Sequence, residues 1–341
     1  MKDFARLPPE ERRDYFVEAA NRLGANQTII EKDFWVCWIL ARLFADPTVR
    51  EGLLFKGGTS LSKAFGVIDR FSEDVDLGVT PATLGFADTD LGDSVSRSQR
   101  DRSFSALQKR CSHHVENVIH RRLEATLLQV LGVREAGSWL EFVVVNDVPE
   151  LRFHYPSHGA ARSAYITPYV KLEFGSLTDQ HPLVEKPVEA MVAKIDGSFA
   201  DLRTIVRVLD VSRTFWEKAT ILHAEFHRPP DKVMPDRYAR HYSDFAALWR
   251  HEAGRGAAKN HGMLLAVAKH KQRFFLTAWA NYEGAAAGTL RLSPPEHRVK
   301  ELERDFAKMQ EMFITEPPPL RRILAEIAAA ETTINAIEPR R

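Results

Sequence analysis

The stretch that decides the fold is FKGGTSLSKAFGVIDRFSEDVDLGV, residues 55–79 of a chain of 341 residues. The apolar run 53–56 predicts a short strand, the GGTS sequence at 57–60 a tight turn, and the residues after it a short helix. Residues 74–79 alternate acidic and apolar side chains, which is typical of a second strand. Because successive side chains of a strand point to opposite faces, we expect Asp74 and Asp76 to lie on one face.

These carboxylates and the glycine turn together predict a site for a nucleoside triphosphate and its metal ion. Two carboxylates held close together repel unless a cation lies between them, and oxygen ligands suit Mg²⁺. Gly57 and Gly58 allow backbone N–H groups to approach a phosphate, and the helix start that follows favours anions. The predicted chemistry is phosphoryl or nucleotidyl transfer, assisted by a metal.

Away from this stretch, the sequence pattern changes from mixed to helical. Strands are predicted at 139–145, 151–155, 169–174 and 204–209, and a polar loop at 80–102. Helices are predicted at 10–23, 29–44, 103–131, 187–195, 213–226 (capped by Ser212), 236–251, 257–282, 295–313 and 319–337. We therefore predict an α/β (α+β) fold, with N-terminal helices and a mixed-sheet core over residues 1–185 and a mostly helical domain over residues 186–341.

Composition excludes several classes of protein. Apolar residues make up 44% of the chain and charged residues 27%, which argues against a disordered protein. Two cysteines, Cys37 and Cys111, cannot form a disulfide framework, so a reducing compartment is expected. No uncharged apolar run reaches the roughly 18 residues of a membrane helix, and the first residues lack the apolar core of a secretory signal. We expect a cytoplasmic protein with no membrane partner.

The formal net charge of +1 hides a separation of charge along the chain. Residues 69–93 have a net charge of −6, whereas residues 97–122 and residues 217–273 each have a net charge of +5. Such runs are often solvated helix faces. They also suit a metal site beside a polyanion such as RNA, and the last stretch interleaves its basic residues with aromatic ones that could stack a base.

The sequence resembles the AbiEii/AbiGii toxin family of the nucleotidyltransferase superfamily, found in toxin–antitoxin and abortive infection systems. The resemblance spans about residues 30–250 and is carried, in order, by FKGGTSLSK, RFSEDVDL, VKLEF, RTFWEKATILH and RYARHYSDFAAL. It implies a nucleotidyltransferase-like core that binds a triphosphate at the glycine turn and a divalent metal at paired aspartates. The residues so implied are Gly57, Gly58, Thr59 and Ser60 for the triphosphate, and Asp74 and Asp76 for the metal.

The later blocks of the resemblance imply further site residues. Glu173 is the candidate for a third metal-binding carboxylate, and Lys171 shares its strand face and is expected to bind the nucleotide. The family's helical lysine corresponds to Lys218, expected to act as a point charge on the triphosphate. The alternative for Lys218 is a solvated lysine on an amphipathic helix.

The family's downstream catalytic aspartate corresponds to Asp244. The sequence departs from the family pattern here, because Ala247 stands in place of a second acid, so only one acidic role carries over. The alternative for Asp244 is a helix-surface ion pair with Arg240, four residues earlier.

The predicted function is a nucleotidyltransferase toxin that depends on Mg²⁺ (or Mn²⁺) and transfers a nucleoside monophosphate from an NTP to an acceptor. The resemblance implies the 3′ end of tRNA as the acceptor and a cognate antitoxin as a partner. Two alternatives remain open at this point. One is a non-catalytic module that binds NTP or RNA, and the other is a metal-dependent nuclease that uses the same carboxylates.

Other motifs offer weaker evidence of function. His223 and His227 lie four residues apart, but no third ligand is evident, so a zinc site is not expected. Cys37 lies in an apolar helix and is expected to be an inert core thiol, and Cys111 has no evident base partner. Arg70, just before the acidic strand, suits either a phosphate contact or a structural role.

Overall fold

The computed structural model describes residues 3–87, 96–157, 166–177, 179, 181–275 and 277–336. It divides into two compact units, Met1–Phe65 with Phe71–Leu209 and Gly66–Arg70 with Asp210–Arg341. The expected domain boundary after residue 185 falls inside a strand of the first unit. None of the described helices combines the length and the apolar composition needed to cross a bilayer.

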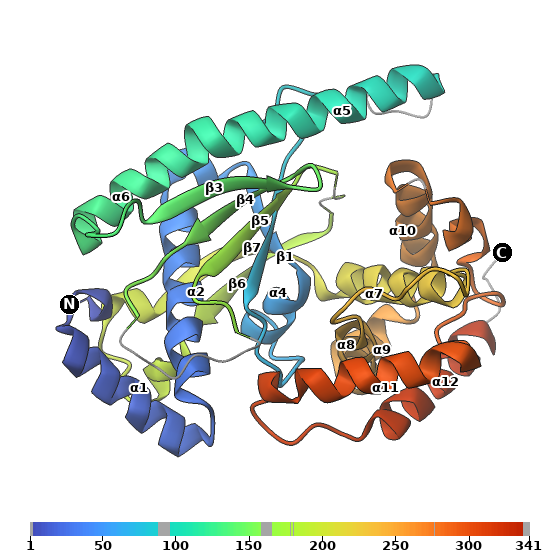
Figure 1. Cartoon of the computed structure of the whole chain (residues 1–341). Helices are drawn as coiled ribbons and strands as arrows, with labels where there is room; N and C mark the ends of the chain where they lie inside the picture. The colour runs from blue at the N-terminus through green and yellow to red at the C-terminus, as the bar shows by residue number, and fades with distance from the viewer. Residues whose placement is uncertain are drawn as a thin grey trace. The chain divides into compact units, whose positions relative to one another are not determined.

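A seven-stranded mixed sheet forms the centre of the first unit (Figure 1). Its strands, in spatial order, are β3 (Leu140–Val145), β4 (Val148–Phe153), β5 (Val170–Gly175), β2 (Asp74–Val79), β1 (Leu53–Lys56), β7 (Arg203–Leu209) and β6 (Leu183–Glu189). β2 pairs parallel with β5 and antiparallel with β1, which pairs parallel with β7. The remaining neighbours are antiparallel. The predicted mixed sheet is confirmed, and its acidic strand lies at the centre.

The helices of the first unit pack around this sheet. They are α1 (Pro9–Leu23), α2 (Gln27–Ala45), α3 (Pro47–Arg50), α4 (Gly57–Lys63), α5 (Arg97–His114), the π-helical η3 (Val115–His120) and α6 (Arg121–Leu131), with short 3-10 turns at Phe4–Arg6, Met191–Lys194 and Ala200–Leu202. The side chain of Asn26 caps α2 by accepting a hydrogen bond from the backbone N–H of Thr28. Trp35 and Trp38 of α2 are fully buried, and α2 contacts β5 and β7. This helix therefore supplies much of the core beneath the sheet.

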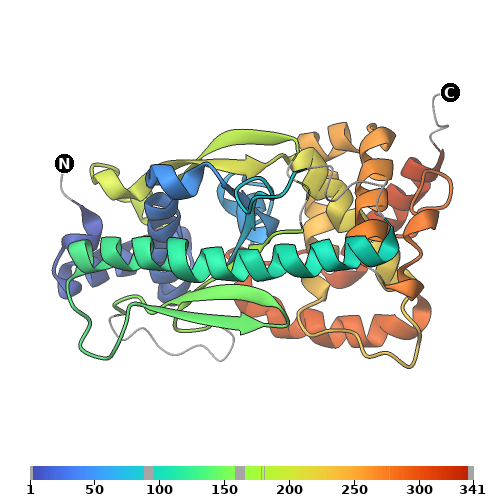
Figure 2. The same ribbon diagram turned by 90° about the horizontal axis from the view of Figure 1, so that it is seen from above.

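The predicted long helix begins earlier than expected. α5 starts at Arg97 because Ser96 and Gln99 form a reciprocal capping box at its N-terminus. It continues through η3 and α6 as one rod, seen from above in Figure 2. The predicted loop is therefore shorter than 80–102, and its residues 88–95 lie outside the described residues.

The helix predicted at 187–195 is wrong. Residues up to Glu189 belong to β6, which pairs in register with β7 along its whole length, and only Met191–Lys194 form a 3-10 turn. Val188 is fully buried, and Pro187 is tolerated because β6 is an edge strand. Pairing with a strand that follows in the sequence overrides the local helical pattern.

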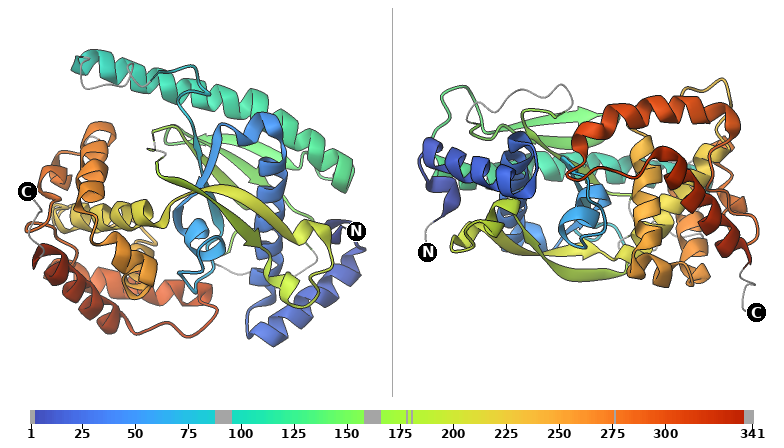
Figure 3. Two further views of the ribbon diagram at one scale, coloured as in Figure 1. Left: turned by 180° about the vertical axis from the view of Figure 1, so that it is seen from behind. Right: turned by 90° about the horizontal axis from the view of Figure 1, so that it is seen from below.

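The second unit is helical, as predicted, and Figure 3 shows its helices from yellow to red. They are α7 (Val211–Phe226), α8 (Ala239–Arg250), α9 (Glu252–Ala257), α10 (His261–Phe274), α11 (Val299–Lys308) and α12 (Leu320–Ala336), with 3-10 turns at Ala278–Ala280, Tyr282–Gly284, Glu296–Arg298 and Met309–Met312. Asp210, not Ser212, caps α7: its carboxylate accepts hydrogen bonds from the backbone and hydroxyl of Ser212. The segment Gly66–Arg70 joins this unit through an isolated β-bridge between Arg70 and Phe313.

The helix predicted over 257–282 is one shorter helix, α10, followed by 3-10 turns. α9 ends at Ala257, and Asn260 caps α10 by accepting a hydrogen bond from the N–H of Met263. α10 ends at Phe274, and Asn281 adopts a left-handed conformation with φ of 48°. A residue in that conformation interrupts a right-handed helix.

Candidate active site

The acidic strand places Asp74 and Asp76 on one face, as predicted. Along β2 the two aspartates are half-buried and alternate with the fully buried Val75 and Leu77. The parallel register with β5 sets Asp74 beside Lys171 and Asp76 beside Glu173. Sheet pairing thus brings together the four charged residues that the sequence predicted for the site.

Asp76 lies directly against the glycine turn. β1 ends at Lys56, which is paired with Asp76, so the chain enters α4 right beside this carboxylate. Gly57 has φ of 77°, and a Cβ atom built on it would lie 1.9 Å from Oδ2 of Asp76. Only glycine leaves room for the Asp76 carboxylate in its observed position, which explains why this strand and this turn occur together.

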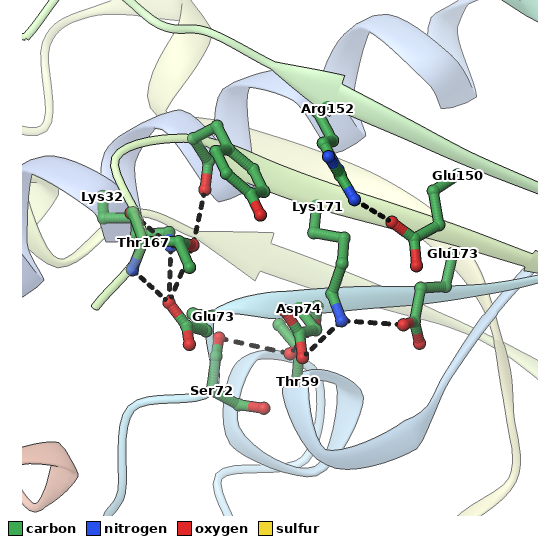
Figure 4. A network of polar contacts seen from close by, with 11 residues as sticks. Lys32, Thr59, Ser72, Glu73, Asp74, Glu150, Arg152, Thr167, Lys171 and Glu173 are labelled. Atoms are coloured by element: carbon green, nitrogen blue, oxygen red, sulfur yellow. Dashed lines mark hydrogen bonds and ion pairs between the residues drawn. The ribbon is translucent and has the colours of Figure 1, made fainter. Parts of the chain in front are cut away.

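An ammonium group lies between two of the site's carboxylates (Figure 4). Nζ of Lys171 is 2.7 Å from Oε1 of Glu173 and 3.2 Å from Oδ2 of Asp74. Burial alone would lower the pKa of Lys171, but the charges of Asp74 and Glu173 outweigh burial, and its pKa lies above the ordinary value. Lys171 is therefore firmly protonated, and it balances part of the negative charge of the carboxylates.

Neighbouring charges act on the carboxyl group of Glu173. Burial and then the charge of Asp76 raise the pKa of Glu173, against the opposing effect of Lys171. The Lys171 ammonium contacts two of these carboxylates, Asp74 and Glu173. Like charges close together favour the neutral form of a carboxyl group, and a cation bound among them would oppose that effect.

The chemistry of this cluster fits a hard divalent cation. All three acidic side chains offer oxygen, the ligand type that Mg²⁺ prefers, and Asp74 and Glu173 already share one cationic group. Within the described residues, no group of three or more His, Cys, Asp or Glu side chains has the closeness that a metal ion requires. Two of the carboxylates, Asp74 and Glu173, instead contact the Lys171 ammonium.

The hydroxyls of the turn bind the protein's own backbone. Thr59 Oγ1 donates to the carbonyl groups of Ser72 and Asp74, and Ser60 Oγ donates to the carbonyl of Gly57 at 2.8 Å. Both residues are buried. Thr59 therefore fastens α4 to the start of the acidic strand. The proposed contact of residues 57–60 with a triphosphate stays a prediction.

A buried ion pair that sequence reasoning missed supports the acidic strand. Lys32 on α2 binds Glu73, with Nζ 2.7 Å from Oε2, and both side chains are at most 2% exposed. Thr167 completes the cluster: its backbone N–H donates to Glu73 at 3.0 Å, and its carbonyl accepts from Lys32 at 2.9 Å. Glu73 directly precedes Asp74, so this cluster holds the first residue of β2. The one available sequence signal is the polar EKD run inside the apolar helix 29–44.

A second buried pair holds the other end of α4. Lys63, the last residue of α4, binds Asp33 with Nζ 2.7 Å from Oδ1, and Asp33 also accepts from the backbone N–H of Met191. The predicted turn 57–60 is the first turn of α4, so adjacent residues of α2 anchor both the acidic strand and the far end of the helix that begins with the two glycines.

The two predicted residues of the second unit, Lys218 and Asp244, bind each other. Lys218 Nζ lies 2.7 Å from Oδ2 of Asp244, and its side chain is only 8% exposed, so the solvated-lysine alternative is wrong. Arg70 adds a bidentate pair to Asp244, at 2.7 and 2.8 Å. The alternative that Asp244 forms a surface ion pair with Arg240 is also wrong, because Asp244 is 1% exposed and bound to these two groups.

The electrostatics of this cluster follow from burial and charge. Burial alone would raise the pKa of Asp244, but the charges of Arg70 and then Lys218 outweigh it and hold the pKa below its ordinary value. Burial and the charge of Lys218 lower the pKa of His241 well below its ordinary value. Neutral His241 can therefore accept a hydrogen bond at Nδ1 from the Lys218 ammonium, 3.1 Å away.

The remaining histidine and cysteine candidates have structural roles. His223 accepts a hydrogen bond at Nδ1 from the backbone N–H of Arg291, and its Nε2 lies 2.9 Å from the carbonyl of Asn281. Its ring nitrogens are thus both used within the protein. Burial raises the pKa of the Cys37 thiol to about 12 and that of Cys111 to about 11.

Comparison with known proteins identifies the family. The family model described as "Nucleotidyl transferase AbiEii toxin, Type IV TA system" matches residues 38–330. The chain belongs to the AbiEii nucleotidyltransferase toxin family. It is therefore a nucleotidyltransferase toxin of a toxin–antitoxin system, and the predicted family and enzyme class are confirmed.

A solved structure has a similar fold. MenT4, a nucleotidyltransferase toxin from Mycobacterium tuberculosis H37Rv, aligns with a TM-score of 0.52 over 95% of this chain and 90% of MenT4, at 15% sequence identity. At this identity the likeness shows the fold, and it confirms the predicted α/β class. A search of curated proteins found no significant match for this AbiEii toxin.

Proposed function

We propose that this AbiEii toxin uses Mg²⁺ to transfer a nucleoside monophosphate from an NTP to the 3′ end of tRNA. The observation that carries the proposal is the arrangement of Asp74, Asp76 and Glu173 on adjacent parallel strands, with the Asp76 carboxylate against Gly57. These oxygen donors are the residues that would hold the ion. Mn²⁺ would bind the same donors.

The protein's own residues would position the substrates. Bound Mg²⁺ would supply a Lewis acid and a counter-charge to the phosphates. The first turn of α4 has no side-chain cap, so its backbone N–H groups are the donors we assign to the triphosphate. Lys218 remains the proposed cationic contact to the phosphates, and Asp244, whose carboxylate binds its ammonium, would orient it. A fixed ammonium loses less freedom when it binds a phosphate.

The proposed acceptor rests on charge and on the family. Residues 97–122 and residues 217–273 each have a net charge of +5, which suits the phosphate backbone of an RNA. An acceptor of this kind would place the reaction in the cytoplasm, where tRNA modification stops translation. The proposed protein partner is a cognate antitoxin.

One incubation tests the proposal. Purified protein is mixed with total tRNA, Mg²⁺ and each labelled NTP in turn, and the RNA is separated by size. Label in full-length tRNA supports nucleotidyl transfer, whereas shortened RNA supports the nuclease alternative. No label with any of the four NTPs would overturn tRNA as the acceptor.

The matched variants are Asp76→Asn and Asp147→Asn. Asp76→Asn removes one carboxylate charge from the site and should lower transfer about a hundredfold or more. Asp147→Asn makes the same chemical change on the exposed turn between β3 and β4 and should leave transfer unchanged. Equal rates for the wild type and Asp76→Asn would show that the metal assignment is wrong.

A further inference from the structure

The ammonium of Lys171 occupies the place among the carboxylates where a bound cation would be expected. It contacts Glu173 at 2.7 Å and Asp74 at 3.2 Å, and the three side chains are only 17–31% exposed. Lys171 lies directly opposite Asp74 in the parallel register and shares a strand face with Glu173. Its position is therefore set by the sheet and does not depend on a flexible loop.

A lysine here reduces the repulsion among the carboxylates when no metal is bound. Like charges this close destabilise a fold unless a cation intervenes. The same oxygen atoms are the donors proposed for the metal, and an oxygen that is hydrogen-bonded to an ammonium is a poorer ligand for a second cation. The ammonium and the metal therefore cannot both have full use of Asp74 and Glu173.

We propose that Lys171 is an internal counter-ion that competes with the divalent cation for Asp74 and Glu173. This inference rests on the proposed metal role of these carboxylates. Lysine suits such a role because its compact ammonium is carried on a flexible stem and can leave without moving the strand. The competition lowers the affinity of the free enzyme for metal. Lys171 is thus a positioning residue for the metal site.

The test is metal binding without turnover. The dissociation constant for Mn²⁺ alone is measured by electron paramagnetic resonance and by calorimetry on the full chain, with no NTP and no RNA. Lys171→Met keeps the length of the side chain and removes its charge. We expect it to bind Mn²⁺ about tenfold more tightly than the wild type, because the competing charge is lost. Lys109→Met, on the exposed surface of α5, is the matched control and should bind like the wild type.

A second variant and a second measurement cover the case in which Lys171→Met folds poorly without metal. Lys171→Arg keeps the positive charge and should not bind Mn²⁺ more tightly than the wild type. The rise in unfolding temperature with added Mn²⁺ should be larger for Lys171→Met than for the wild type, starting from a lower metal-free value.

The outcomes separate this inference from the proposed function. If the wild type binds Mn²⁺ clearly and Lys171→Met binds it equally or more weakly, Lys171 does not compete with the metal. The assignment of the metal to these carboxylates is then unaffected. Absence of binding by both proteins overturns the competition and the metal assignment together. Tighter binding by Lys171→Met that is lost again in the double variant with Asp76→Asn supports both.

Discussion

The carboxylate of Asp76 lies in the space that a side chain at Gly57 would fill, since a Cβ atom there would come within 1.9 Å of Oδ2. The glycine turn and the acidic strand are therefore one structural unit. The clash extends along the side chain to the Cβ atom of Asp76, at 2.9 Å, so a larger residue at position 57 would displace the carboxylate and also press on β2.

We expect Gly57→Ala to impair nucleotidyl transfer far more than it impairs folding. The positive φ of 77° costs alanine about 1 kcal/mol, and the displaced Asp76 carboxylate should lower transfer about a hundredfold. Transfer assays and thermal unfolding measure the two effects. The control is Gly24→Ala, which has a φ of 63° and no atom within 4 Å of the added Cβ. It should lose only the stability that the backbone conformation costs, with unchanged transfer, and a loss of transfer in both variants would contradict the expectation.

The core of this site could be predicted from the sequence because its contacts are local or periodic. The two-residue period of a strand places Asp74 with Asp76 and Lys171 with Glu173. The parallel pairing of β2 with β5, which joins the two pairs, is a long-range contact that periodicity does not specify.

The buried charges could not be predicted, because their partners are distant in the sequence. Helical spacing alone predicts an ion pair between Asp244 and Arg240. The observed partner is Arg70, 174 residues away in the sequence. The same limit explains the wrong helix at 187–195, where pairing with β7 decides the structure. The cap of α7 depends on adjacent residues, and Asp210 lies two residues before the predicted cap, Ser212.

The cysteines provide a test of burial. Because burial raises the pKa values of Cys37 and Cys111 to about 12 and about 11, almost no thiolate is present at pH 8. We expect neither thiol to react with iodoacetamide in the native protein at that pH, and both to react in urea. Mass spectrometry counts the adducts. An adduct on either thiol that forms at the same rate in native and unfolded protein would show that the thiol is accessible.

The buried pair of Lys32 and Glu73 should couple strongly in stability. Lys32→Met leaves a buried carboxylate without its cation and should lower the free energy of unfolding by about 3 kcal/mol. The double variant with Glu73→Gln removes both charges and should recover part of that loss. Urea unfolding of the single and double variants gives the coupling free energy. If the double variant loses the sum of the free energies of unfolding that the two single variants lose, the two side chains do not interact.

The pair of Arg70 and Asp244 should make stability depend on pH in a defined direction. The pKa of Asp244 lies below its ordinary value of 3.8 in the folded protein, so the folded state binds this proton less tightly than the unfolded state. The stabilisation is therefore fully present above about pH 5, and it is lost as the pH falls below the ordinary value. Asp244→Asn should lower the free energy of unfolding by about 3 kcal/mol at pH 7, because it leaves the buried cations Arg70 and Lys218 without their anion.

Urea unfolding at pH 7 and at pH 3 measures this dependence. The difference in free energy of unfolding between the wild type and Asp244→Asn should be smaller at pH 3 than at pH 7. Arg70→Gln should resemble Asp244→Asn at pH 7, because it removes the bidentate partner at 2.7 and 2.8 Å. Arg240→Gln removes the arginine that sequence spacing offers as a partner and should cost less than about 1 kcal/mol. A larger loss for Arg240→Gln than for Arg70→Gln would reverse the assigned pairing. If that difference in free energy of unfolding is the same at both pH values, Asp244 has an ordinary pKa in the folded protein.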